Sequence, residues 1–357
     1  MSADRAGMVE AALRERELDA LLVGDPANLR WLTGFTGSNG AAVVGPGVRR
    51  FLTDFRYLAQ SREQLDASWG DAEIASDLLE RAAEGGLPAR VGFADDHMTV
   101  KAHERLSSLV GDGVELVAAG GLVEELRLVK TDEEIALVRA AAALADEAFT
   151  EVVLEGGIVG RTERDVALDL EFAMRRRGAE GASFPPIVAA GAHGALPHAE
   201  PRDVEIPADT LVVIDWGAMK DGYASDCTRT VATGEVDPRD REIYDLVLRA
   251  QREALAAIRP GPSGREIDAV ARGIIDGAGH AEHFGHGLGH GVGLEVHEGP
   301  RLSKQGDTAL AAGQIVTVEP GVYVPGHVGV RIEDLVVVTE DGTDVLSSLS
   351  KDLTTVR

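Results

Sequence analysis

Two aspartates lie on apolar β-strand patterns that a short turn joins. Residues 212–216 form an apolar run containing Asp215, and residues 223–231 form a second strand pattern containing Asp226, with the hairpin-type turn Lys220-Asp221-Gly222 between them. In a hairpin with a two-residue loop, opposed residues have numbers whose sum is odd. The numbers 215 and 226 meet that condition, so both carboxylates face one side.

Two carboxylates on one face repel each other unless they share a cation or a proton. A solvated face would remove the repulsion, but the run before Asp215 is typical of a buried strand. The hairpin therefore predicts half of a metal site.

A glycine-rich run over residues 284–300 carries three histidines, His286, His290 and His297. Glycine lets the backbone approach a site closely, and imidazole is the commonest metal ligand and a ready acid or base. A glycine-rich loop with incidental histidines is the simpler interpretation of one histidine, but three at these spacings favour a functional site. The spacing alone does not select one of them as a ligand.

Two glutamates follow farther along the chain. Glu319 ends an apolar strand pattern just before a turn, and residues 328–338 form another strand that contains Arg331 and Glu333 on a shared face. An ordinary Arg–Glu surface pair would have the same spacing. Hairpin parity does not bring Glu319 and Glu333 together unless a bulge or a loop of odd length intervenes.

Composition limits the classes of partner. The 357 residues are enough for about two domains, and 44% of them are hydrophobic, as expected for a soluble globular protein. The net charge of −25 disfavours nucleic acid and anionic membrane surfaces. The single cysteine, Cys227, excludes an internal disulfide, and residues 1–19 lack the apolar stretch of a signal peptide. No apolar run reaches membrane-spanning length, and we expect a cytoplasmic protein.

Strand and helix patterns divide the chain into two predicted domains, 1–124 and 125–357, with the boundary inside residues 120–130. The first alternates strands and helices and is predicted to be an α/β domain. Its expected strands are 18–23, 41–44, 50–53, 90–93 and 114–117, and its expected helices are 55–65, 74–83 and 100–110. In the second, Thr131 and Glu134 form a capping box before a helix over 135–152. Further helices are expected at 163–177 and 240–258, and the remainder is expected to be rich in strands.

These segments resemble the pita-bread metallopeptidase family, which includes methionine aminopeptidase, aminopeptidase P and prolidase. The resemblance covers residues 130–357 and implies an α+β catalytic domain after the α/β domain. Residues 33–38 and 53–57 resemble the creatinase-like N-terminal domain, which simple methionine aminopeptidases lack. Creatinase itself lacks the full ligand set. The family's ligand order of Asp, Asp, His, Glu, Glu falls here on Asp215, Asp226, His290, Glu319 and Glu333.

Further matches favour the proline-directed branch of that family. Residues 184–198 resemble the segment that supplies one catalytic histidine, here His198, and His297 matches the second. The resemblance implies that Glu319 moves the proton of the attacking water to the leaving nitrogen and that the two histidines stabilise the oxyanion or hold substrate. Arg331 matches an arginine that orients Glu319, His297 or a substrate carboxylate.

The function implied is hydrolysis of Xaa-Pro bonds at peptide N-termini by two divalent metal ions, as in aminopeptidase P. The alternative is an Xaa-Pro dipeptidase, or prolidase. The oxygen-rich donor set suits Mn²⁺, with Co²⁺ or Zn²⁺ as substitutes. Other hypotheses are a non-catalytic binding protein on this fold and a mononuclear hydrolase that uses the histidine run alone. By resemblance, we expect a homodimer and a proline-containing peptide as substrate.

Overall fold

The computed structural model describes residues 4–357, so residues 1–3 of the predicted first domain lie outside it. The chain divides into two compact units, Met1–Arg127 and Leu128–Arg357. The sequence-based boundary at 124/125 falls three residues before this division. No helix in the described part of the chain is both long and apolar enough to cross a membrane.

The first unit is built on a mixed six-stranded sheet with the order β4-β3-β2-β1-β5-β6. Strands β1 and β5 and strands β5 and β6 run parallel, whereas β1, β2 and β3 are antiparallel neighbours. The strands are β1 (Ala20–Val23), β2 (Gly40–Gly45), β3 (Val48–Thr53), β4 (Glu73–Ile74), β5 (Arg90–Phe93) and β6 (Glu115–Ala118). The helices are α1 (Arg5–Glu15), α2 (Pro26–Thr33), α3 (Leu58–Gln64), α4 (Leu78–Glu84), α5 (Val100–Val110) and α6 (Leu122–Arg127).

The predicted α/β class of this unit is confirmed. The expected helix over 74–83 begins only at Leu78, because Ile74 pairs with Thr53 in the sheet. Helix α2 was missed in the sequence, although Asp25 caps it and Pro26 occupies its first turn, a common pattern at a helix start.

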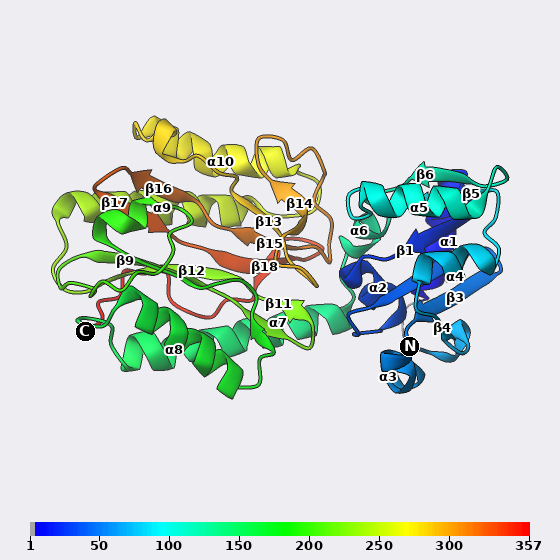
Figure 1. The fold of residues 1–357 in the computed structure, drawn as a ribbon. Coiled ribbons are helices and arrows are strands. Elements are labelled where there is room, and N and C mark those ends of the chain that lie inside the picture. The colour runs from blue at the N-terminus through cyan, green and yellow to red at the C-terminus, as the bar shows by residue number, and fades with distance from the viewer. Residues whose placement is uncertain (1–3) are drawn as a thin grey trace. The chain divides into compact units, whose positions relative to one another are not determined.

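The second unit places two helix pairs on opposite sides of curved strands (Figure 1). Helices α7 (Asp132–Phe149) and α8 (Glu163–Arg176) share one apolar core with β8, β9 and β12. Helices α9 (Pro238–Ala257) and α10 (Gly264–Gly277) share another with β15, β16, β17 and β18. Helix α10 corrects our expectation that this region held only strands and turns, and Ser263 and Glu266 form its capping box.

The strands of the second unit form several small sheets, with the orders β12-β9-β8, β11-β10-β7, β14-β13-β15-β18-β19 and β16-β17. Their bounds are β7 (Gly181–Ala182), β8 (Ile187–Ala190), β9 (Leu211–Trp216), β10 (Ala218–Lys220), β11 (Tyr223–Ala224), β12 (Cys227–Ala232), β13 (Gly289–Gly291), β14 (Glu298–Leu302), β15 (Ile315–Val318), β16 (Gly321–Val324), β17 (Val328–Arg331), β18 (Asp334–Val338) and β19 (Thr343–Val345).

Candidate metal centre

The aspartate hairpin has the geometry predicted from its turn. Asp221 and Gly222 have φ values of 49° and 76°, as a type I′ two-residue loop requires. The register pairs Asp215 with Thr228, so Asp226 is the diagonal neighbour on the same face. One carboxylate oxygen from each aspartate and one from Glu333 all lie within 4.8 Å of one another.

A loop of odd length brings Glu319 and Glu333 to opposed positions on neighbouring chain segments. Strand β15 pairs with β18 so that Val318 is opposite Asp334, which makes Glu319 and Glu333 the next opposed positions. The β16–β17 hairpin between them turns through three residues, with Gly326 at φ 72°. The expected single strand over 328–338 is wrong: it breaks after Arg331, and its two halves lie in different sheets.

His290 is the histidine of the glycine-rich run that faces these acids. Its Nε2 lies 3.3 Å from Glu319 Oε1 and 3.6 Å from Asp226 Oδ2. Its Nδ1 lies 3.0 Å from the carbonyl oxygen of Gly291, which can only accept, so Nδ1 carries a proton and Nε2 is the ring nitrogen directed at the acids.

The flanking glycines explain the composition of the run. A Cβ on Gly289 would lie 2.0 Å from the Thr317 carbonyl oxygen, and one on Gly291 would lie 1.8 Å from that of Gly299. Larger residues would therefore push His290 away from the acids.

Two observations show that a cation fits among these side chains. Asp215 Oδ1 and Glu333 Oε1 are buried, and neither has a hydrogen-bond partner among the described residues. Burial, and then the neighbouring carboxylates, raise the pKa values of Asp226 and Glu333 well above their ordinary range. Burial opposes ionisation of Glu319 too, but the hydrogen bond and charge of His290 outweigh it and lower that pKa to about 2. Divalent cations would offset the repulsion among the four acids.

Arg331 is buried beside the acids. Its guanidinium donates to Asp215 Oδ2 at 2.5 Å, to the Tyr323 hydroxyl at 2.9 Å and to the Pro197 carbonyl oxygen at 3.1 Å. Its Nε donates to Thr228 Oγ1 at 3.0 Å. Its ionic partner is therefore Asp215, whereas the resemblance implied Glu319, His297 or substrate.

A cavity of about 760 Å³ opens onto this cluster. His198 and His297 both line it, and the ring of His297 is centred 4.4 Å from that of His290. Burial, and then the nearby His290, lower the pKa of His297, so its imidazole is neutral near pH 7. The hydrogen bonds of His286 instead go to the Gly287 carbonyl oxygen and the Tyr323 hydroxyl.

The sequence reasoning missed Tyr323 and Arg301. Tyr323 lies in β16, beyond the turn that follows Glu319, so the period of one strand does not connect the two residues. Arg301 in β14 is exposed and lines the cavity, but no residue pattern near it signals that role.

Comparisons with known proteins match both units. The model described as Metallopeptidase family M24 matches residues 136–340, and that of the Creatinase/Prolidase N-terminal domain matches residues 5–129. The Xaa-Pro dipeptidase of Pyrococcus furiosus is 33% identical over 95% of this chain and 96% of its own length. The solved Xaa-Pro dipeptidase from Bacillus anthracis superposes with a TM-score of 0.95 at 38% identity, with 100% of both chains covered. The X-Pro aminopeptidase from Thermotoga maritima has a TM-score of 0.87 at 33% identity and covers 97% of this chain and 100% of its own.

Proposed function

The chain belongs to metallopeptidase family M24, as the sequence resemblance predicted, and we propose that it hydrolyses Xaa-Pro dipeptides. We further propose that two divalent cations are held by Asp215, Asp226, His290, Glu319 and Glu333. The observation that carries the metal assignment is the convergence of Asp215, Asp226 and Glu333 with two buried, unpartnered carboxylate oxygens. His290 joins them, with its Nε2 3.6 Å from Asp226 and 3.3 Å from Glu319. Bound cations would lower the pKa of water toward about 7 and polarise the scissile carbonyl.

The protein side chains then divide the remaining work. Glu319 lines the cavity beside the proposed cation site, where its carboxylate can accept a proton from water and pass it to the leaving nitrogen. His198 and neutral His297 line the cavity, where an imidazole N–H can donate to the oxyanion. Arg331 holds Asp215 and is a positioning residue.

The dipeptidase alternative fits better than our first expectation of aminopeptidase P, because several close relatives are Xaa-Pro dipeptidases. Arg301 supports this choice from the structure. It lines the same cavity as His198 and His297, which places a positively charged residue in the wall of the proposed reaction site. A dipeptide has its free carboxylate one residue beyond the scissile bond, within range of such a charge, whereas a longer peptide has an amide there.

The donor set is mainly oxygen and favours Mn²⁺. A homodimer and a cytoplasmic location remain proposals that rest on the family resemblance and on the composition.

The test is hydrolysis of Ala-Pro beside Ala-Pro-Ala with added Mn²⁺. We expect the dipeptide alone to be cleaved, and Arg301→Gln to raise the KM for Ala-Pro about tenfold or more with little change in kcat. Preferential cleavage of the tripeptide would instead establish aminopeptidase P activity. One bound ion per chain would favour the mononuclear hypothesis, and no cleavage of either peptide would favour a binding protein.

A further inference from the structure

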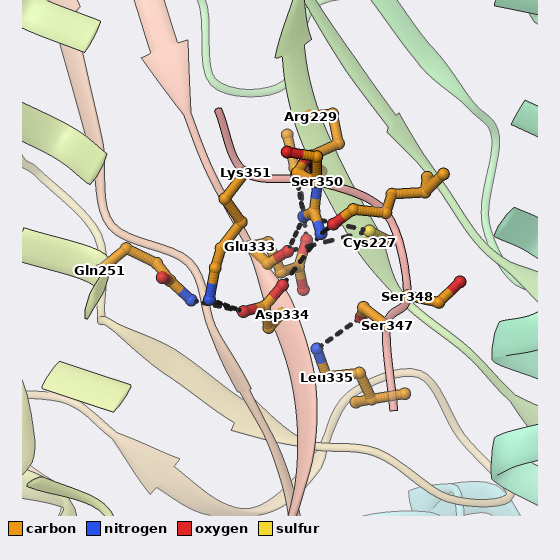
Figure 2. Close-up of polar contacts among 12 residues, drawn as sticks. Cys227, Arg229, Gln251, Glu333, Asp334, Leu335, Ser347, Ser348, Ser350 and Lys351 are labelled. Atoms are coloured by element: carbon orange, nitrogen blue, oxygen red, sulfur yellow. Dashed lines mark hydrogen bonds and ion pairs between the residues drawn. The ribbon is translucent and has the colours of Figure 1, made fainter. Parts of the chain in front are cut away.

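A buried polar cluster surrounds the main chain of Glu333 (Figure 2), and its members Arg229, Asp334 and Lys351 do not line the cavity. At its centre, Arg229 Nη2 lies 3.0 Å from Asp334 Oδ1, and the two side chains are only 3% and 1% exposed. Arg229 belongs to β12, three residues after Asp226, and Asp334 directly follows Glu333. The pair therefore joins the two chain segments that carry two of the proposed ligands.

Arg229 directs its donors at main-chain oxygens. Its Nη1 donates to the carbonyl oxygen of Glu333 and, at 3.0 Å, to that of Thr228. Its Nε and Nη2 reach the carbonyl oxygens of Ser350 and Leu349, at 3.0 and 2.8 Å. Lysine could not replace it, because an ammonium is a point donor without the planar fork that serves acceptors in several directions.

Asp334 completes the cluster on its far side. Its Oδ2 accepts from Gln251 Nε2 at 3.0 Å and from Lys351 Nζ. The C-terminal residues 349–351 therefore contact both members of the central ion pair (Figure 2).

Glu333 needs support of this kind because it lies in the break between β17 and β18. Its N–H donates to the Thr228 carbonyl oxygen at 3.1 Å, and its Oε2 accepts from Thr228 Oγ1 at 2.8 Å. The other side-chain oxygen has no partner among the described residues. Arg229 holds the carbonyl oxygen of Glu333, and its ion pair with Asp334 holds the residue that follows.

We propose that Arg229, with Asp334 and Lys351, positions Glu333 against Asp226 and thereby sets the affinity of the centre for its cations. This inference rests on the proposed metal function and extends it to residues that touch neither substrate nor cation. Outer partners of this kind typically change metal affinity 10- to 100-fold when they are lost. The competing explanation is that the cluster serves only to stabilise the fold.

The experiment measures Mn²⁺ affinity by titration, and the visible spectrum of the Co²⁺ form, in the full-length chain. Arg229→Lys should weaken the affinity for at least one ion about 10- to 100-fold and shift the Co²⁺ bands. Lys351→Met is the milder variant, since Lys351 is 18% exposed and does not contact Glu333, and it should change both readouts in the same direction.

Ser348→Ala is the matched control. Ser348 lies in the same C-terminal segment, but its N–H and hydroxyl both donate to Asp146, at 2.6 and 2.7 Å, and not to Arg229, Glu333 or Asp334. We expect this variant to lower the unfolding temperature of the metal-free protein without changing metal affinity. If Arg229→Lys and Lys351→Met both keep the wild-type Mn²⁺ affinity and Co²⁺ spectrum, this inference is overturned and the proposed function is not. A wild-type chain that binds no divalent cation would overturn the proposed function, and this inference with it.

Discussion

Glu163 offers a test of how the wall of the cavity is held. It is the first residue of α8 and is 1% exposed, and it accepts from the Ala190 N–H at 2.9 Å and from the Arg202 N–H at 3.1 Å. It also accepts from His193 Nδ1 at 3.0 Å and from the Arg202 guanidinium at 3.0 Å. One carboxylate thus holds both ends of the segment 190–202, and this segment carries His198.

Glu163→Ala should lower the free energy of unfolding by about 3–5 kcal/mol, since it breaks a buried charged cluster and leaves main-chain donors unpaired. The Arg202 side chain is 47% exposed, so its share is screened and adds less than about 1 kcal/mol. We expect kcat/KM to fall as His198 loses its fixed position, while metal affinity stays unchanged. Urea unfolding, Ala-Pro kinetics and Mn²⁺ titration measure the three effects.

Arg164→Met is the control on the same helix. Arg164 pairs with Asp203, and the two side chains are 54% and 68% exposed, so the change should stay within about 0.5 kcal/mol. A Glu163→Ala loss of this small size would refute the reasoning.

The pH dependence of Glu163→Gln gives a second check. Burial favours the neutral acid, but the bonds from Arg202, Ala190 and His193 outweigh it and lower the pKa of Glu163 below its ordinary value of 4.5. A lowered folded-state pKa stabilises the fold fully above the unfolded value, and the effect is lost as pH falls through the folded one. The stability difference between wild type and Glu163→Gln should therefore stay constant from about pH 8 to 5 and shrink below about 4.5. A stability difference between wild type and Glu163→Gln that grows as the pH falls would contradict a lowered pKa of Glu163.

Two further substitutions test the metal centre. Asp226→Ala should lose bound metal and peptidase activity together, as exhaustive chelation of the wild type should; full activity without metal would exclude the proposed chemistry. Tyr323→Phe leaves Arg331 Nη1 and His286 Nε2 without the hydroxyl that lies 2.9 Å from each. It should destabilise the protein by about 1–3 kcal/mol in thermal unfolding and lower kcat/KM with metal content retained; a neutral result would assign the hydroxyl no part in holding Arg331.

The aspartate half of the site follows from local rules, because both residues lie on one hairpin whose turn sequence fixes the register. The lysine, aspartate and glycine at 220–222 identify that turn, and a two-residue loop leaves one parity. The glutamate half depends on pairing between β15 and β18, which are not consecutive strands. Parity places Glu319 opposite Glu333 only if the loop between β16 and β17 has three residues, Pro325-Gly326-His327. The sequence alone does not give that loop length.

Spacing alone did not select a ligand among the three histidines, and only the family's ligand order pointed to His290. His286, His290 and His297 lie in similar glycine-rich surroundings, and only the fold brings Nε2 of His290 to Glu319. The partner of Arg331 was equally inaccessible, because Asp215 is 116 residues away along the chain. Helix α10 was missed for a different reason: its capping box and apolar spacing are local, but the surrounding glycines and prolines were interpreted as turns.

Glu163 and Arg229 play similar structural parts but hold different parts of the proposed site. Each buried side chain fixes main-chain groups of a segment that lies far away in the sequence. Glu163 holds the segment with His198, which faces substrate, whereas Arg229 holds the carbonyl of Glu333, a proposed ligand. None of the described residues that hydrogen-bond to Glu163 also hydrogen-bonds to Arg229. Loss of Glu163 should therefore lower substrate turnover, and loss of Arg229 should lower metal affinity. Both losses should destabilise the same unit, and because the two sites share no partner, their effects on stability should add.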